Sequence, residues 1–483
     1  MLPWNSIIKI NPSTKRPIYL QIVDSIIEEI LAGRLQSCQR IPGTRTMSEK
    51  LALNRKTVAT SYDELLAQGW IEVIPSSGTF IAHKLPIVKH KALDLPNKPA
   101  NNHFIQSIND LPLSFRSMPN LLEKRIDDGS PDYRLAPIEA LIKTARSLVK
   151  GRIGKALLLD RDPLGEITLR KTLVNYLSET RAIHGSPDQL LITRGSQMAL
   201  YLLFNLIVQP GDQVIVTRLN YQVADQMVLC RGGKILRVDT DEEGINVDQV
   251  EKLCKSKSIR AMYITPHHHF PTTVTTSAER RMRLLEMSNE YHFAIIEDDY
   301  DYDYHYDRTP ILPLASLDKS GNVIYIGSFG KMLAPSIRIG YMYGHQRIIR
   351  QCATYRRIID KVGDPIIERA IAELLLENEI QRSIKKAVSA YQTRRDEFVS
   401  ILKNEFKDYL SFKIPDGGMA IWSNFRTDII ISDLVKKCSQ EHLSLDVDTN
   451  LDKSSCRLGF ASVNALEIRE NLSILLKVLR QYY

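Results

Sequence analysis

The chain has 483 residues, of which 43% are hydrophobic and 25% charged, and its formal net charge is +8. This composition is typical of a globular protein of two to four domains, and it excludes a mostly disordered chain, a collagen-like chain and a small disulfide scaffold. The longest apolar runs, such as 200–208, are far shorter than the ~20 residues that span a bilayer, so we expect no membrane span. The start lacks the pattern of a secretory signal and the six cysteines form no C-x-x-C pair, so we expect a cytoplasmic protein with reduced thiols.

The positive charge is concentrated near the N-terminus. Residues 1–90 hold eleven Lys/Arg against seven Asp/Glu, so the first fifth of the chain carries half of the net charge of +8. A small basic module joined to a larger, nearly neutral body suggests a polyanionic partner for the module.

The first 82 residues predict a winged helix-turn-helix. Apolar residues recur at helical spacing, Gly33 follows the first helix, and Asn54 is a good N-cap for the third. A turn between two short β-rich runs completes a hairpin. The predicted elements are helices over 17–31, 47–53 and 54–68 and strands over 71–74 and 79–82.

Basic residues gather before and at the start of the third predicted helix: Arg40, Arg45, Lys50, Arg55 and Lys56. A recognition helix presents its N-terminal residues to base edges, while nearby cations contact phosphates. The pattern therefore favours DNA binding, although by itself it also fits a solvated basic face.

Three stretches in this region closely resemble the DNA-binding domain of GntR-family regulators: Arg40-Ile-Pro-Gly-Thr-Arg45, Asn54-Arg-Lys-Thr-Val58 and Ser77-Gly-Thr-Phe80. The resemblance implies contacts between this domain and double-stranded operator DNA, with the wing glycine near the minor groove. The predicted DNA-binding residues are Arg40, Arg45, Arg55, Lys56, Thr57 and Gly78.

The chain is predicted to have three parts. The DNA-binding domain covers 10–83, a proline- and lysine-containing linker covers 84–125, and the body covers 126–483. In the body, helical and strand patterns alternate, which predicts an α/β fold with a mostly parallel sheet. The clearest of these segments are helices over 169–182 and 197–208 and strands over 190–193, 213–217, 261–265, 293–297 and 323–326.

Polar residues follow three of the predicted strands, and ligands of such sheets bind beyond the carboxyl ends of the strands. Gly195 and Ser196 open a helix after the first of these strands, an arrangement that can bind an anion or simply cap the helix. Asp298 and Asp299 follow another strand, where carboxylates suggest a metal ion, a cationic group or a solvated loop.

The third strand end carries Lys331 among small residues. Partial desolvation there would lower the pKa of the lysine and make its amine nucleophilic. Arg338, seven residues on, has a guanidinium suited to phosphate. An anion site, a carboxylate and a reactive lysine together fit one ligand, pyridoxal 5′-phosphate (PLP).

The order of these motifs resembles the aspartate-aminotransferase fold, with large and small subdomains, and more closely the MocR branch of the GntR family, in which that fold follows a GntR-type head. The stretches that carry the resemblance include Thr193-Arg-Gly-Ser-Gln197, Tyr263-Ile-Thr-Pro266, Ile296-Glu-Asp-Asp-Tyr300, Lys331-Met-Leu-Ala-Pro335, Arg338-Ile-Gly-Tyr341 and Arg457-Leu-Gly-Phe-Ala461. The resemblance implies a homodimer with sites at the subunit interface.

The resemblance also implies roles for individual residues. Lys331 would form the Schiff base, Asp298 would pair with the pyridine nitrogen, and Arg457 would receive the carboxylate of an amino-acid-like effector. The alternative for Arg457 is an arginine at the surface of a strand. The remaining cofactor-binding residues would be Ser196, Gln197, Tyr221, Tyr300, Ser328 and Arg338.

Some positions depart from the family pattern. Gly330 stands where a serine usually precedes the lysine, and Asp160 stands where a tyrosine often reaches the cofactor phosphate. The usual Ser-His-Gln-Phe-Pro-x-Gly reads His267-His-His-Phe-Pro-Thr-Thr273. Three consecutive histidines cannot easily face one ion, so we predict a reshaped loop and no metal site.

The sequence thus predicts a DNA-binding transcriptional regulator whose body senses PLP, or a small amino compound that reacts with bound PLP. An active aminotransferase that carries a DNA-binding domain is the alternative, and a body that has lost the cofactor and serves as a dimerisation scaffold is a third possibility. We expect any transaminase turnover to be weak.

Overall fold

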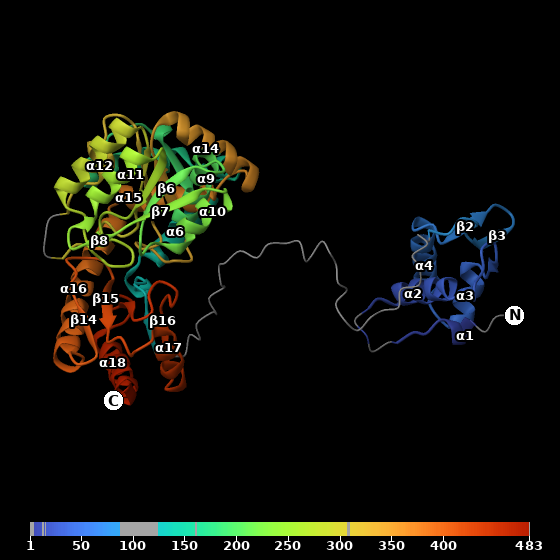
Figure 1. Cartoon of the computed structure of the whole chain (residues 1–483). Helices are drawn as coiled ribbons and strands as arrows, with labels where there is room; N and C mark the ends of the chain where they lie inside the picture. Colours follow the sequence, from blue (N-terminus) through green and yellow to red (C-terminus); the bar gives the residue numbers. More distant parts are fainter. Residues whose placement is uncertain are drawn as a thin grey trace. The chain divides into compact units, whose positions relative to one another are not determined.

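The computed structural model describes residues 4–11, 14, 16–86, 124–159, 162–306 and 310–482. The chain forms two compact units, Met1–Asn109 and Asp110–Tyr483, which we call the head and the body (Figure 1). Most of the predicted linker, and Asp160 near the start of the body, lie outside the described residues. The boundaries of the linker therefore stay a prediction.

The head is a winged helix-turn-helix, as predicted. Its elements are α1 (Trp4–Ile7), α2 (Ile18–Leu31), β1 (Arg40–Ile41), α3 (Thr44–Leu51), α4 (Arg55–Ala67), β2 (Ile71–Ile74) and β3 (Gly78–Ile81). Strand β3 lies between β1 and β2 and is antiparallel to both. The predicted stripe of α2, with Ile22 and Ile26, packs in one core with Val58 of α4. The Asn54 side chain caps α4 by accepting a 2.8 Å hydrogen bond from the Lys56 amide.

The body is built on a seven-stranded sheet in which only β13 is antiparallel to its neighbours. In spatial order the strands are β5 (Leu190–Thr193), β13 (Gly340–Tyr343), β12 (Val323–Ser328), β11 (Ala294–Asp299), β10 (Ile259–Ile264), β6 (Gln213–Thr217) and β7 (Lys234–Val238). The central strands are nearly continuous apolar runs, which is typical of strands buried on both faces.

Helices cover both faces of this sheet (Figure 1). Alternate strand residues enter different cores, so that Tyr263 packs on one face and Met262 on the other. One face is covered by α9 (Gly195–Ile207), α10 (Gln222–Cys230) and α14 (Gln346–Ile359). The opposite face is covered by α6 (Ile138–Lys150), α8 (Ile167–Arg181), α11 (Val247–Ser256), α12 (Ala278–Tyr291) and α15 (Pro365–Leu376).

A smaller subdomain completes the body. An antiparallel sheet of β14 (Leu410–Phe412), β15 (Ala420–Phe425) and β17 (Ser455–Gly459) packs with α16 (Glu379–Glu405), α17 (Ile431–Gln440) and α18 (Ala465–Leu479). Strand β4 (Lys124–Asp127) pairs in parallel with β16 (Leu443–Asp446). This pairing ties the first described strand of the body to the small subdomain and carries Asp128 and Gly129 toward the large sheet.

The other elements of the described residues are α7 (Gly154–Leu159), β8 (Thr240–Asp241), β9 (Gly244–Ile245), α13 (Leu314–Leu317) and three single-turn 3-10 helices. Among the described helices, none combines the length and the apolar character needed to cross a membrane.

Candidate functional site

A pocket of about 450 Å³ lies at the carboxyl edge of the large sheet. Side chains from the ends of the strands and from the start of α9 form one wall, and residues of the small subdomain form another. Seven of the predicted cofactor and effector residues line it: Ser196, Gln197, Tyr221, Asp298, Tyr300, Lys331 and Arg457. These residues are spread over 262 positions of the sequence, and the large sheet and the small subdomain together bring them into one pocket.

Lys331 lies in the turn after β12 and reaches into the pocket. Its Nζ donates a 2.6 Å hydrogen bond to the carbonyl oxygen of Gly129 and lies 5.9 Å from the centroid of the Tyr300 ring. Burial lowers the pKa of Lys331. A larger fraction of the amine is therefore neutral and nucleophilic near neutral pH than in an exposed lysine.

Asp298 lies in β11 with its carboxyl group in the pocket. The Tyr263 hydroxyl donates to Oδ2 at 2.9 Å, whereas no described residue donates to the buried Oδ1. Burial raises the pKa of Asp298 to about 7. A cationic N–H donor in the pocket would favour the carboxylate form and satisfy Oδ1.

The adjacent Asp299 points away from the pocket, because successive residues of a strand face opposite sides of the sheet. Its Oδ2 accepts a 2.9 Å hydrogen bond from the Tyr325 hydroxyl. Burial raises its pKa to about 6, and the charge of Arg181 opposes that shift. Asp299 is therefore part of the packing beneath the sheet, and Asp298 is the carboxylate of the pocket.

The N-terminus of α9 forms a corner next to the pocket whose groups suit an anion. Gly195 has φ +75°, and a Cβ atom at this position would lie 3.0 Å from Nη2 of Arg338. The same Nη2 donates a 3.3 Å hydrogen bond to the carbonyl oxygen of Arg194. The helix terminus, the Ser196 hydroxyl and this guanidinium therefore converge, in the manner of phosphate sites at helix N-termini.

Two predicted residues, Ser328 and Arg338, do not themselves line the pocket. Ser328 ends β12, pairs with Gly340 of β13, and its Oγ accepts a 3.1 Å hydrogen bond from the Gly330 amide. Gly340 in turn abuts Gly195, because a Cβ atom there would lie 2.8 Å from the Gly195 Cα. Both predicted residues thus lie beside the corner at α9.

Arg457 lies in β17 and is only 4% exposed, so it is not an arginine of the surface. It donates from Nη1 to the Tyr300 hydroxyl at 3.1 Å and from Nε to the Asp128 carbonyl oxygen at 2.9 Å. Its guanidinium carbon lies 4.9 Å from the centroid of the Phe270 ring. These contacts fix a buried cation in the wall of the pocket.

Tyr221 lies just before α10, and its ring packs edge-on against Phe270 at 5.6 Å between centroids. Gln197 donates from Nε2 to the Tyr221 hydroxyl at 2.7 Å. Gln197 was predicted to bind the cofactor, and in the described structure its side-chain amide orients this tyrosine.

The lining residues that sequence reasoning missed include Asp128, Tyr263, Thr265 and Phe270. Tyr263 lies near the end of β10, the strand beside β11, and Thr265 directly follows it, so a search of every strand end could have found both. Asp128 is 170 residues before Asp298 in the chain, and only the pairing of β4 with β16 places it here.

In the head, the predicted DNA-binding residues occupy the starts of two helices and the wing. Arg55, Lys56 and Thr57 open α4, and Arg45 is the second residue of α3. The three cations among them are exposed. Arg40 lies against the wing, because a Cβ atom at Gly78, with φ +123°, would lie 3.2 Å from Nε of Arg40. Arg45 forms an ion pair with Glu49 at 3.5 Å, but both side chains are largely exposed, and such pairs contribute little to stability.

The head and the body each match a known family. Residues 127–475 match aminotransferase class I and II, and residues 18–81 match the gntR family of bacterial regulatory proteins. The protein as a whole is similar to a probable rhizopine catabolism regulatory protein, MocR, of Rhizobium meliloti. The two are 26% identical over 95% of this chain and 93% of that protein. It is also similar to the HTH-type transcriptional regulator TauR of Rhodobacter capsulatus, at 24% identity over 94% and 95% of the two chains.

Among solved structures, the body is similar to a kynurenine aminotransferase of Pyrococcus horikoshii in complex with PMP, with a TM-score of 0.68 and 26% identity. That match covers 74% of this chain and 91% of the other. An archaeal alanine:glyoxylate aminotransferase matches with a TM-score of 0.70 and 25% identity, over 75% and 92% of the two chains.

Fold and pocket together define a DNA-binding head joined to an aminotransferase-like body. The chain belongs to the aminotransferase class I and II family and, through its GntR-type head, to the MocR-type regulators of the GntR family. Aminotransferases of this fold are PLP-dependent enzymes, which agrees with the cofactor predicted from the sequence.

Proposed function

We propose that this protein is a PLP-dependent transcriptional regulator whose body senses PLP, or an amino compound that reacts with bound PLP. One observation carries the proposal: a chain with exposed cations on a recognition helix also has a pocket that combines Lys331 with Asp298. Exposed cations on a recognition helix add nothing to the chemistry of an enzyme, and a simple repressor needs no pocket of this kind.

The chemical groups that line and flank the pocket fit those of PLP. The buried Oδ1 of Asp298, to which no described residue donates, suits a protonated ring nitrogen. The corner at Gly195, Ser196 and Arg338 suits the phosphate, and Tyr221 supplies an aromatic face for the ring. These are the three chemical features that distinguish this cofactor from other pocket-sized anions.

When bound, PLP would supply an aldehyde that amines attack and a ring that withdraws electrons. The Lys331 amine is the nucleophile that would hold it covalently, and its lowered pKa favours the neutral form that reacts. Asp298 would hold a proton at the ring nitrogen, and the Tyr300 hydroxyl, oriented by Arg457, faces the same pocket.

The effector of the proposed sensor would be a small amino-acid-like compound, or PLP itself. Arg457 has a buried guanidinium that could bind the carboxylate of the effector, because guanidinium groups bind carboxylates in a bidentate manner. The partner of the head would be operator DNA, and a homodimer would place two heads on two half-sites.

An active aminotransferase is the second candidate function, and the combination of Lys331, Asp298 and Arg457 in one pocket favours it. The two functions differ in turnover. A sensor converts bound cofactor at most once with an amine, whereas an enzyme sustains steady-state conversion with an amino donor and a keto acid.

The covalent role of Lys331 is tested by adding PLP to the purified protein and reducing it with borohydride. We expect the visible absorbance of bound PLP, and after reduction a cofactor-modified peptide that contains Lys331. The Lys331→Ala variant should show neither, whereas Lys319→Ala, a change at an exposed lysine, should match the wild type. Reduction onto another lysine in the wild type would contradict the assignment.

A further inference from the structure

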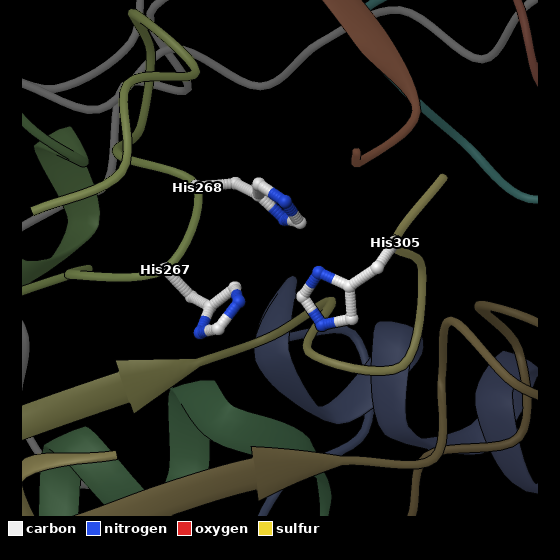
Figure 2. Close-up of side chains that lie close together, drawn as sticks. All are labelled: His267, His268 and His305. Atoms are coloured by element: carbon white, nitrogen blue, oxygen red, sulfur yellow. The ribbon is translucent and has the colours of Figure 1, made fainter. Parts of the chain in front are cut away.

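Three histidines of the body meet at a point outside the cofactor pocket (Figure 2). His267 and His268 lie in the loop after β10, and His305 lies in the segment after β11. One possible ligand nitrogen from each ring lies within 4.8 Å of the other two. Figure 2 shows the rings of His267 and His268 turned toward the ring of His305 across a common space.

The third consecutive histidine is not part of this cluster. The Nδ1 of His269 is 2.8 Å from the Thr272 hydroxyl, and its Nε2 is 2.9 Å from the Thr217 hydroxyl. Both of its ring nitrogens are therefore occupied. The sequence prediction that three consecutive histidines cannot face one point agrees with this geometry, but it did not consider a third ligand from another loop.

We propose that His267, His268 and His305 bind one divalent transition-metal ion of the Zn²⁺ type. Imidazole is a preferred ligand of Zn²⁺, Cu²⁺ and Ni²⁺, and three histidines with one open position are a recurrent zinc arrangement. No sulfur or hard oxygen ligand is needed to complete the protein part of the site.

The hydrogen bonding of the rings is what a metal site requires. His268 uses Nδ1 for a 2.8 Å contact with Oδ1 of the buried Asp301, which leaves Nε2 for the ion. Ligand histidines are commonly oriented by a carboxylate in this way. His267 is 3% exposed and its Nδ1 has no hydrogen-bond partner among the described residues, and the same holds for Nε2 of His305. Unsatisfied buried nitrogens are costly and call for a ligand.

The space around the cluster also suits an ion. A second pocket, of about 270 Å³, is lined by all three histidines and can admit a water molecule as the fourth ligand. A Cβ atom at Gly417 would lie 2.6 Å from Nε2 of His268, so glycine leaves this nitrogen accessible. Nitrogen ligands of a tetrahedral zinc ion are about 3.3 Å apart, so binding would draw nitrogens that lie within 4.8 Å of one another closer by up to about 1.5 Å.

The cluster is close to the cofactor pocket but uses none of its side chains. The link is the backbone of His268, whose carbonyl oxygen accepts a 2.9 Å hydrogen bond from the Tyr300 hydroxyl. A metal ion would therefore stabilise the loop against which Tyr300 rests. The proposal does not depend on whether PLP binds.

The test uses the full-length protein after treatment with a chelator, titrated with Co²⁺ and then with Zn²⁺. We expect one equivalent of Co²⁺ with visible bands of nitrogen and oxygen ligation and no thiolate charge-transfer band, and displacement of the Co²⁺ by Zn²⁺. X-ray absorption of the Zn²⁺ form should show about three imidazoles and no sulfur. Absence of stoichiometric binding would overturn the proposal, and so would a sulfur ligand, which would point instead to the exposed pair of Cys38 and His83.

Variants locate the site. His305→Gln and His267→Gln should abolish the stoichiometric binding of Co²⁺. Asp301→Asn, which keeps the size of the side chain, should weaken Zn²⁺ binding about 10–100-fold. His184→Gln changes an exposed histidine outside the cluster and should bind as the wild type does. Wild-type affinity in the Asp301 and His305 variants would contradict the site, and the X-ray absorption measurement decides the question even where a variant fails to fold.

Discussion

At the scale of single residues, the cofactor proposal depends on a choice between two adjacent aspartates. Asp298 and Asp299 are both buried, each accepts one tyrosine hydroxyl, and each has one carboxylate oxygen without a donor among the described residues. They differ in direction, since only Asp298 lines the pocket. The charge of Asp298 is therefore available to a ligand, and the charge of Asp299 is balanced by groups beneath the sheet.

We predict that Asp298→Asn weakens PLP binding about 10–100-fold, because a charged hydrogen bond contributes about 1.5–3 kcal/mol. Asp299→Asn is the matched control, and it should change the affinity much less. An absorbance titration of folded protein with PLP measures both constants. Equal losses of affinity in the two variants would contradict the assignment of Asp298 to the ring nitrogen.

The same carboxyl groups make the stability of the cofactor-free protein depend on pH. Burial raises the pKa of Glu297 and of Asp298 to about 7 and that of Asp299 to about 6. A carboxyl group whose pKa is raised in the folded protein contributes its full stabilisation at a pH below its pKa in the unfolded chain, which is near 4. This contribution is lost as the pH rises through the pKa of the group in the folded protein. Their contribution therefore falls between about pH 4 and pH 7.

We predict that Asp298→Asn reduces the fall in thermal stability of the cofactor-free protein between pH 5 and pH 8, because asparagine has no charge to bury. The measurement is the melting temperature at each pH for wild type and variant. Asp408→Asn, at an exposed carboxylate, should keep the wild-type dependence. An unchanged pH dependence in Asp298→Asn would show that this carboxyl group does not titrate as its burial requires.

Sequence reasoning found the residues that follow apolar strands and missed those that tertiary structure alone brings in. Ser196, Asp298 and Lys331 each stand out as polar positions at the end of an apolar run. Asp128 and His305 have no such signal, because the first enters through the pairing of β4 with β16 and the second through the path of the segment after β11.

At the scale of elements, the starts of α3 and α4 and the wing define the proposed DNA surface. Arg55 opens α4, and its cap, Asn54, is formed as the sequence predicted. Helices and strands with long apolar patterns were predicted well, whereas α1 and β1, of four and two residues, are too short to have a period. The antiparallel direction of β13 was not predictable either, because strand direction depends on the connection and not on apolar pattern.

We predict that Arg55→Ala, and separately Arg45→Ala, weakens operator binding while the absorbance of bound PLP stays unchanged. A base contact is worth about 1–3 kcal/mol and alters sequence preference, whereas a phosphate contact weakens all sequences alike and lowers the salt dependence. Electrophoretic or fluorescence binding assays at several salt concentrations separate the two cases.

The matched control for these variants is Arg34→Ala. Arg34 is an exposed arginine paired with Glu29 at the end of α2. The other end of α2 is the one near the start of α4, because Tyr19 shares a small surface pocket with Asn54 and Thr57. Arg34→Ala should bind operator as the wild type does. Normal binding by both Arg45→Ala and Arg55→Ala would contradict the proposed DNA surface.

At the scale of the whole molecule, the central claim is that the body controls the head. A ligand shifts an equilibrium only by its differential affinity for the two states, and the coupling between two sites is reciprocal. If the body is a sensor, PLP or its reaction with an amine must therefore change the affinity of the full-length protein for its operator. Typical couplings of about 1–3 kcal/mol correspond to changes of about 5–150-fold.

The most direct test is the operator affinity and footprint of the full-length protein, with and without PLP and candidate amines, for wild type, Lys331→Ala and the control Lys319→Ala. We predict that PLP or an amine changes the affinity or footprint of wild type and Lys319→Ala, and that neither ligand changes those of Lys331→Ala. The isolated head should bind DNA without any response to PLP. Identical operator binding by the wild type under every condition, in protein that demonstrably holds PLP, would contradict the sensor and favour the aminotransferase.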